Sequence, residues 1–201
     1  ASHGWLAVGI DHIGNVRYDN AEGETVEIFA KRALDVSAAL DVIAALPDED
    51  MLSRADTSEV LSTGHSRGTS TVWALCGASI DPSRDIADLS EELQSFFLKG
   101  FRDDRVVASV LMDGLRRGGL YGEHGYATSV TPMMFQAGLE EYGNAKKHWE
   151  AIPYTDISLV EISGGCHQTF ALGACSTLPA AEGFAIVGAF NLAMGRHHVL
   201  G

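Results

Sequence analysis

Short apolar runs alternate with longer segments of helical periodicity along most of this 201-residue chain. Strands that alternate with helices favour parallel pairing, because each crossover helix returns the chain to the same end of the sheet. The sequence therefore predicts an α/β fold, with a mostly parallel sheet flanked by helices. Buried strands are predicted at 5–11, 60–63, 104–112, 133–137 and 157–162. Helices are predicted at 24–46, 69–77, 144–151 and 179–199, with one or two more within 83–100.

The chain is long enough to bury one core, and it contains no internal repeat, low-complexity stretch or interdomain linker. Residues 1–201 are therefore predicted to form a single domain. The charged segment within 78–103 is the candidate for a small helical insertion in that domain.

The charge balance narrows the classes of partner. Lysine and arginine total 14 against 27 acidic residues, which gives a formal net charge of −13. A chain this acidic repels phosphate backbones, so nucleic acid is not an expected partner. A membrane-spanning helix is not expected either, because the sequence has no continuous apolar run of the length that a bilayer requires.

Residues 64–68 read Gly-His-Ser-Arg-Gly and match the pattern G-x-S-x-G. The pattern lies between a predicted strand and a predicted helix, where a serine on a sharp turn would be exposed at the top of the sheet. Glycines allow strand and helix to approach closely, and the helix N-terminus favours negative charge. Ser66 is therefore predicted to be a nucleophile, with the backbone N–H of Arg67 as an oxyanion donor.

A nucleophilic serine needs a base, and the base needs an acid that orients it. In this type of fold the three follow in the order serine, acid, histidine, each after a later strand. His167 lies in a glycine-rich turn after the last predicted strand and is the predicted base. His65 is next to Ser66 but is expected to point away from it.

The acid has three candidates. Glu140 and Glu141 follow the predicted strand 133–137, which is the expected position for the acid. Asp113 follows the preceding strand and is the less usual alternative. Either type of carboxylate can hold an imidazole in one tautomer.

Three cysteines are present, at positions 76, 166 and 175, and no C-x-x-C motif occurs. Cys166 and Cys175 are close enough in sequence to form a short disulfide loop, although free thiols are an equal alternative. A disulfide would favour an oxidising compartment, either secreted or periplasmic.

In combination, these segments resemble α/β-hydrolases of the dienelactone hydrolase-like type, including the cutinase-like esterases. The resemblance covers nearly the whole chain and implies a serine carboxylic-ester hydrolase with no metal or organic cofactor. The family's Gly-x-x-Asp, counted from Gly138, falls on Glu141 and so implies Glu141 as the acid, ahead of Glu140. The matching segments are SHGWLAVGIDHIGN, KRALDVSAALDVIAAL, GHSRG, DDRVVASVLMD, TPMMFQAGLEEYG, LVEISGGCHQTF and FAIVGAFNLAMGRHHVLG.

The same resemblance implies that the family's N-terminal strands and its His-Gly oxyanion loop have no counterpart here. The sheet would then have an open edge that a second chain or segment could complete. The expected substrate is a small-molecule or polymer ester. The alternative, from a different functional class, is a non-catalytic protein of this fold that binds a ligand or a partner.

Overall fold

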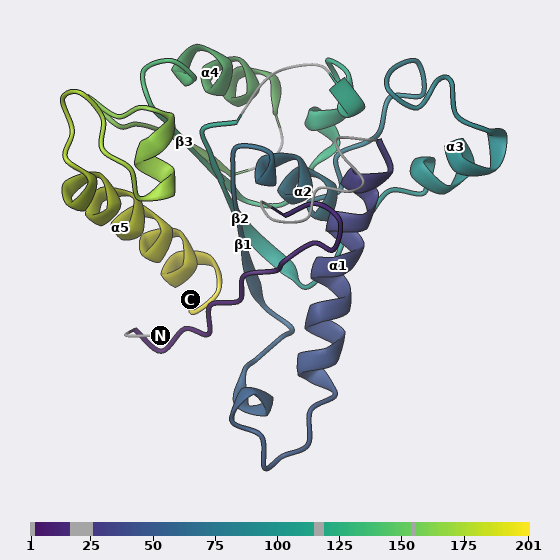
Figure 1. Ribbon diagram of the computed structural model, residues 1–201, viewed down its shortest axis with the longest axis horizontal. Helices are drawn as coiled ribbons and strands as arrows, with labels where there is room; N and C mark the ends of the chain where they lie inside the picture. The colour runs from purple at the N-terminus through teal and green to yellow at the C-terminus, as the bar shows by residue number, and fades with distance from the viewer. Residues whose placement is uncertain (1–2, 17–25, 115–118, 154–155) are drawn as a thin grey trace.

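The computed structural model describes residues 3–16, 26–114, 119–153 and 156–201. Its centre is a four-stranded parallel sheet in which the spatial order of the strands, β1-β2-β3-β4, is also their order in the chain (Figure 1). The predicted α/β fold with a parallel, helix-flanked sheet is confirmed. The strands are β1 (Val60–His65), β2 (Val106–Met112), β3 (Met133–Ala137) and β4 (Ile157–Glu161).

Five α-helices are present among the described residues, and they cover the two faces of the sheet. Helices α1, α2 and α4 contribute side chains to one apolar cluster, whereas α5 contributes to the cluster on the other face. No helix in the described part of the chain has the length and apolarity needed to cross a bilayer. The helices are α1 (Val26–Ala44), α2 (Gly68–Leu75), α3 (Glu91–Leu98), α4 (Tyr142–Ala151) and α5 (Ala180–His198).

The central strands β2 and β3 are buried on both faces. Val110, Leu111, Met133 and Phe135 have no exposed surface, as expected for parallel strands covered by helices on both sides. Trp73 of α2 packs against Phe135 across the same cluster. This rigid centre fixes the carboxyl ends of the strands, where the polar residues discussed below lie.

Helix boundaries agree with the predicted segments to within a few residues. Helix α1 ends shortly before Pro47, which cannot continue a helix; the predicted start at Glu24 lies outside the described residues. Within 83–100 only Glu91–Leu98 is α-helical, and Ser90 caps it by accepting a hydrogen bond from the backbone N–H of Leu93. Helix α3 is anchored to the core by buried Phe97.

The strand predicted at 5–11 is not part of the sheet. This segment is mostly exposed, and Leu6 and Val8 retain 42% and 51% of their surface. Together with β1 and α1 it lines a groove of about 1050 Å³. An apolar run indicates a tendency to be buried, but a strand also needs a neighbour with which to pair. Among the described residues, β1 has a partner strand only on its β2 side.

Candidate active site

Ser66 lies at the tip of the turn between β1 and α2, with a backbone φ of 55°. This left-handed conformation is strained for a residue with a side chain. A Cβ on Gly64 would lie 2.4 Å from the carbonyl oxygen of Gly68, so the close approach of strand and helix requires glycine at position 64. A Cβ on Gly68 would meet nothing within 4 Å, so only one of the two flanking glycines is required by contact.

The end of the neighbouring strand, β2, also packs closely against this turn. A Cβ on Gly114, just after β2, would lie 2.2 Å from the carbonyl oxygen of Ser66. The hydroxyl of Thr69 is 2.7 Å from the Ser66 carbonyl oxygen and 2.8 Å from that of Gly114. The position of Ser66 is therefore defined by two strand ends together, a role for Gly114 that sequence reasoning missed.

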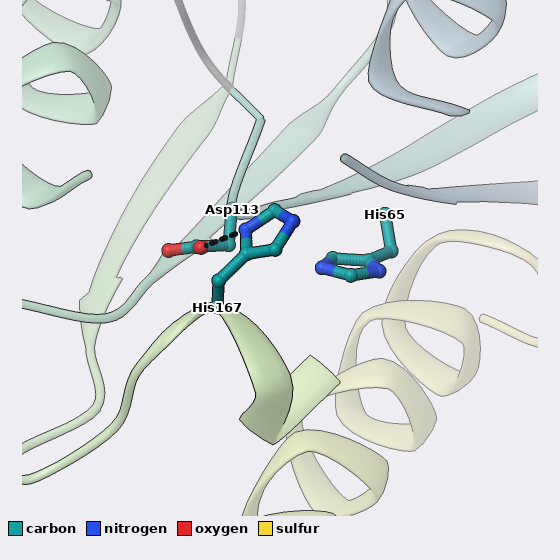
Figure 2. A group of neighbouring side chains, drawn as sticks. All are labelled: His65, Asp113 and His167. Carbon is teal, nitrogen blue, oxygen red and sulfur yellow. Dashed lines mark hydrogen bonds and ion pairs between the residues drawn. The ribbon is translucent and has the colours of Figure 1, made fainter. Parts of the chain in front are cut away.

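Three side chains form a continuous line of hydrogen bonds. The Nε2 of His167 is 3.1 Å from the Oγ of Ser66, and its Nδ1 is 2.6 Å from Oδ2 of Asp113. Figure 2 shows the Asp113 carboxylate facing the His167 ring. Asp113 is only 1% exposed, and its Oδ1 accepts a hydrogen bond from the backbone N–H of Gly138 at 3.0 Å. The carboxylate is thus fixed from both sides.

The expectation that Glu141 orients His167 is wrong in this structure. Glu141 is at the start of α4, where its carboxylate accepts a hydrogen bond from the Asn144 side chain at 3.1 Å. Glu140 is exposed. The alternative, Asp113, contacts His167 because its own backbone is left-handed, with φ of 45°, where β2 ends beside β3. The feature of the sequence that could have identified Asp113 is its position, followed by a glycine, directly after the most apolar strand.

His65 lies beside His167, a contact that the sequence did not predict. Its ring centroid is 4.5 Å from that of His167 and 5.9 Å from that of Phe170. Alternation along a strand sends neighbours to opposite faces, but β1 ends at His65 and the rule does not extend to Ser66. Burial, and then the neighbouring His167, lower the pKa of His65 below its ordinary value and favour the neutral imidazole.

A disulfide joins Cys166 and Cys175, which was one of the two alternatives left open by the sequence. The bond encloses the 3-10 helix η4 (His167–Ala171), which begins at His167 itself. The third cysteine, Cys76, is buried, and burial raises its pKa to about 11. The disulfide therefore closes a short loop around His167 and leaves Cys76 in the core.

Two groups of side chains among the described residues have the composition and spacing to hold a metal ion. One consists of His65, Asp113 and His167, and the other of Asp156, His197 and His198; within each group the ligand atoms lie within 4.8 Å of one another. The first group shares two residues with the hydrogen-bonded line to Ser66. The second joins the C-terminal end of α5 to Asp156, just before β4, and is largely exposed.

Chemically, the arrangement is able to move a proton. A carboxylate that accepts from Nδ1–H leaves the Nε2 lone pair of His167 directed at the serine hydroxyl. Arg67 follows Ser66 at the N-cap position of α2, where backbone N–H groups favour negative charge.

The sequence matches no protein-family model and no curated protein.

Proposed function

We propose that this protein is a serine hydrolase of the α/β-hydrolase type that cleaves carboxylic esters through an acyl-enzyme on Ser66. The observation that carries the proposal is the line of hydrogen bonds from Asp113 through His167 to Ser66. The order serine, aspartate, histidine along the chain is the order characteristic of this fold. In addition, Ser66 has the strained backbone of a nucleophile on a tight turn.

In the proposed reaction, the Oγ of Ser66 attacks the ester carbonyl carbon while Nε2 of His167 takes the hydroxyl proton. The tetrahedral intermediate collapses, the bond to the alcohol oxygen breaks, and His167 returns the proton to the departing alcohol. Water then attacks the acyl-enzyme with His167 as base again, which releases the acid and restores Ser66. Asp113 stays ionised and stabilises the imidazolium that forms in each half of the reaction.

The backbone N–H of Arg67 is proposed as one donor to the oxyanion, because it directly follows the nucleophile at the start of α2. Ser66 and His167 are both partly exposed, which supports access for a small ester or for a segment of a polymer ester. The particular acyl and alcohol groups are left open by this proposal.

We also propose that a further segment or a second chain completes the sheet at β1. The outer edge of β1 faces the groove lined by residues 4–10, and backbone groups on such an edge are available for pairing. Trp5, which lines this groove, supports the proposal, because its buried indole N–H has no hydrogen-bond partner within the described part of the chain.

The proposal is tested by hydrolysis of p-nitrophenyl acetate and butyrate, together with labelling by a fluorophosphonate. We expect turnover and stoichiometric labelling of the unaltered chain, and neither in Ser66→Ala. Ser70→Ala is the matched control, because it removes a serine hydroxyl from α2, the helix that follows Ser66, and should leave both readouts unchanged. Retained turnover in Ser66→Ala would refute the assignment. An unreactive Ser66 in the folded, unaltered chain would instead favour the non-catalytic binding protein.

A further inference from the structure

We infer that His65 and His167 together form a binding site for a divalent transition-metal ion such as Zn²⁺, and that the bound ion blocks the reaction. The binding site depends only on the arrangement of the two imidazole rings. The inhibition also rests on the proposed function, because it requires His167 to be the base.

The first ligand is His65. Its Nε2 is buried and has no hydrogen-bond partner among the described residues, which is costly for a polar atom unless something satisfies it. The ring is held beside His167, with 4.5 Å between the ring centroids, and Figure 2 shows the two imidazoles next to each other. Imidazole nitrogen is the commonest protein ligand for transition metals.

The second ligand is His167, whose tautomer is already set for metal binding. Its Nδ1 bonds to Asp113 at 2.6 Å, so the proton belongs on Nδ1 and the lone pair on Nε2. Metal-binding histidines are typically held in this way, by a carboxylate on the ring nitrogen that does not touch the metal. Asp113 would therefore orient the ligand and remain hydrogen-bonded to it.

The inhibition follows from the fact that Nε2 has one lone pair. In the proposed reaction this lone pair takes the proton of Ser66, 3.1 Å away. A metal ion coordinated at Nε2 occupies the same electron pair, and the serine hydroxyl then has no base. Two imidazoles with water in the remaining positions suit Zn²⁺, Cu²⁺ or Ni²⁺, whereas Mg²⁺ and Ca²⁺ prefer oxygen ligands.

The exposed group of Asp156, His197 and His198 is a competing site that an experiment must separate from this one. It consists of two residues at the end of α5 and one just before β4, and it includes neither Ser66 nor His167. An ion bound there leaves the proposed base untouched. Substitutions at His65 on the one hand, and at His197 and His198 on the other, assign binding to one site or the other.

The test is a calorimetric titration of Zn²⁺ into the Ser66→Ala protein, so that binding is measured without turnover. His65→Phe is the informative variant, because it keeps an aromatic ring beside His167 and Phe170 but removes the nitrogen. We expect it to weaken the binding at least about tenfold, and we expect His197→Ser/His198→Ser to leave a site of unchanged affinity. Equal affinity with and without His65, or loss of all binding in the double variant, would overturn the inference.

Activity supplies the second readout. In chains that retain Ser66, Zn²⁺ should inhibit hydrolysis, EDTA should reverse the inhibition, and Mg²⁺ should have no effect. The fraction of activity lost at a given Zn²⁺ concentration should be smaller in His65→Phe than in the unaltered chain; an equal fraction would refute the inference. Binding that depends on His65 in a protein without esterase activity would support the metal site and refute the proposed function. Esterase activity without such binding would do the opposite.

Discussion

Asp113 is the residue on which the geometry of the candidate site depends most. Its backbone N–H donates to the Gln136 carbonyl, its Oδ1 accepts from the Gly138 N–H and its Oδ2 contacts His167. These contacts tie the end of β2 to β3 and to the loop that carries His167. A carboxylate so firmly held selects one tautomer and one orientation of the imidazole.

Replacement of this carboxylate should therefore be far more costly than replacement of the glutamate favoured by the sequence. We expect Asp113→Asn to lower kcat for p-nitrophenyl butyrate on the order of 10³–10⁴-fold, because the amide no longer holds the productive tautomer. Glu141→Gln should change kcat little, since its carboxylate contacts Asn144. Steady-state kinetics of the two variants decide between them. A greater loss in Glu141→Gln would move the role back to Glu141.

At the scale of elements, the turn between β1 and α2 is held by its contact with the end of β2. Gly114 lies directly against the backbone of Ser66, and Thr69 joins the carbonyl groups of both. Ser66 is thus positioned by the packing of one turn on another. Neither turn alone fixes it.

A methyl group at this contact should disturb both stability and activity. We expect Gly114→Ala to lower the free energy of unfolding by about 1–3 kcal/mol, because the added Cβ forces the two turns apart. Gly68→Ala is the control, since its Cβ would meet nothing within 4 Å. Urea unfolding and ester hydrolysis are measured on both. Equal effects of the two substitutions would contradict this account of the turn.

The helix η4 and its disulfide form the second element on which the site depends. The bond between Cys166 and Cys175 closes a loop that begins at His167. Closing a loop of this length is expected to stabilise the fold by about 2–3 kcal/mol, through a smaller entropy of the unfolded chain. It also restricts the position of His167.

Removal of the bond should therefore lower both the Tm and the activity. We expect Cys166→Ser/Cys175→Ser to unfold at a lower temperature and to lose turnover at temperatures where it is still folded, because His167 is less well held. Calorimetry and kinetics measure the two effects. Dithiothreitol should reproduce them in the unaltered chain and have no further effect on the double variant. Full activity without the bond would show that η4 needs no covalent restraint.

At the scale of the whole molecule, a charged cluster joins α1 to the start of β2. The guanidinium of Arg105 makes two hydrogen bonds to Asp103 and one to Asp41 of α1, and Ser37 of the same helix donates to Asp103. The Arg105 hydrogen bonds hold the pKa of Asp103 at about 2, below its ordinary value of 3.8. The fold thus favours the ionised carboxylate.

This shift predicts a definite dependence of stability on pH. The pKa of Asp103 is lower in the folded chain, so its ionised carboxylate adds to the free energy of unfolding. This contribution amounts to about 2 kcal/mol; it is complete above about pH 4 and is lost as the pH falls towards 2. Asp103→Asn should lack this component of acid destabilisation and be less stable at pH 7. Asp104→Asn is the control, because Asp104 is 87% exposed. Urea unfolding at several pH values tests this, and parallel curves for the unaltered chain and Asp103→Asn would contradict it.

The sequence by itself determined the α/β class, the parallel sheet and the serine on its turn. These depend on local periodicity and on a short motif, both of which act between residues close in the chain. The pairing of His167 with Ser66 was also predictable, because equivalent ends of parallel strands meet at one edge of the sheet. The proximity of Cys166 and Cys175 in the sequence was enough to suggest a disulfide between them, but not to show that it forms.

Only the tertiary structure decided which carboxylate contacts His167, where His65 lies and whether residues 5–11 join the sheet. The choice between Asp113 and Glu141 depends on a left-handed backbone at one residue, which turns a side chain toward the neighbouring strand. The contact of His65 with His167 was not predictable, because strand alternation ends where the strand does. An apolar run becomes a strand only when another strand lies beside it, and no pattern within the run itself contains that information.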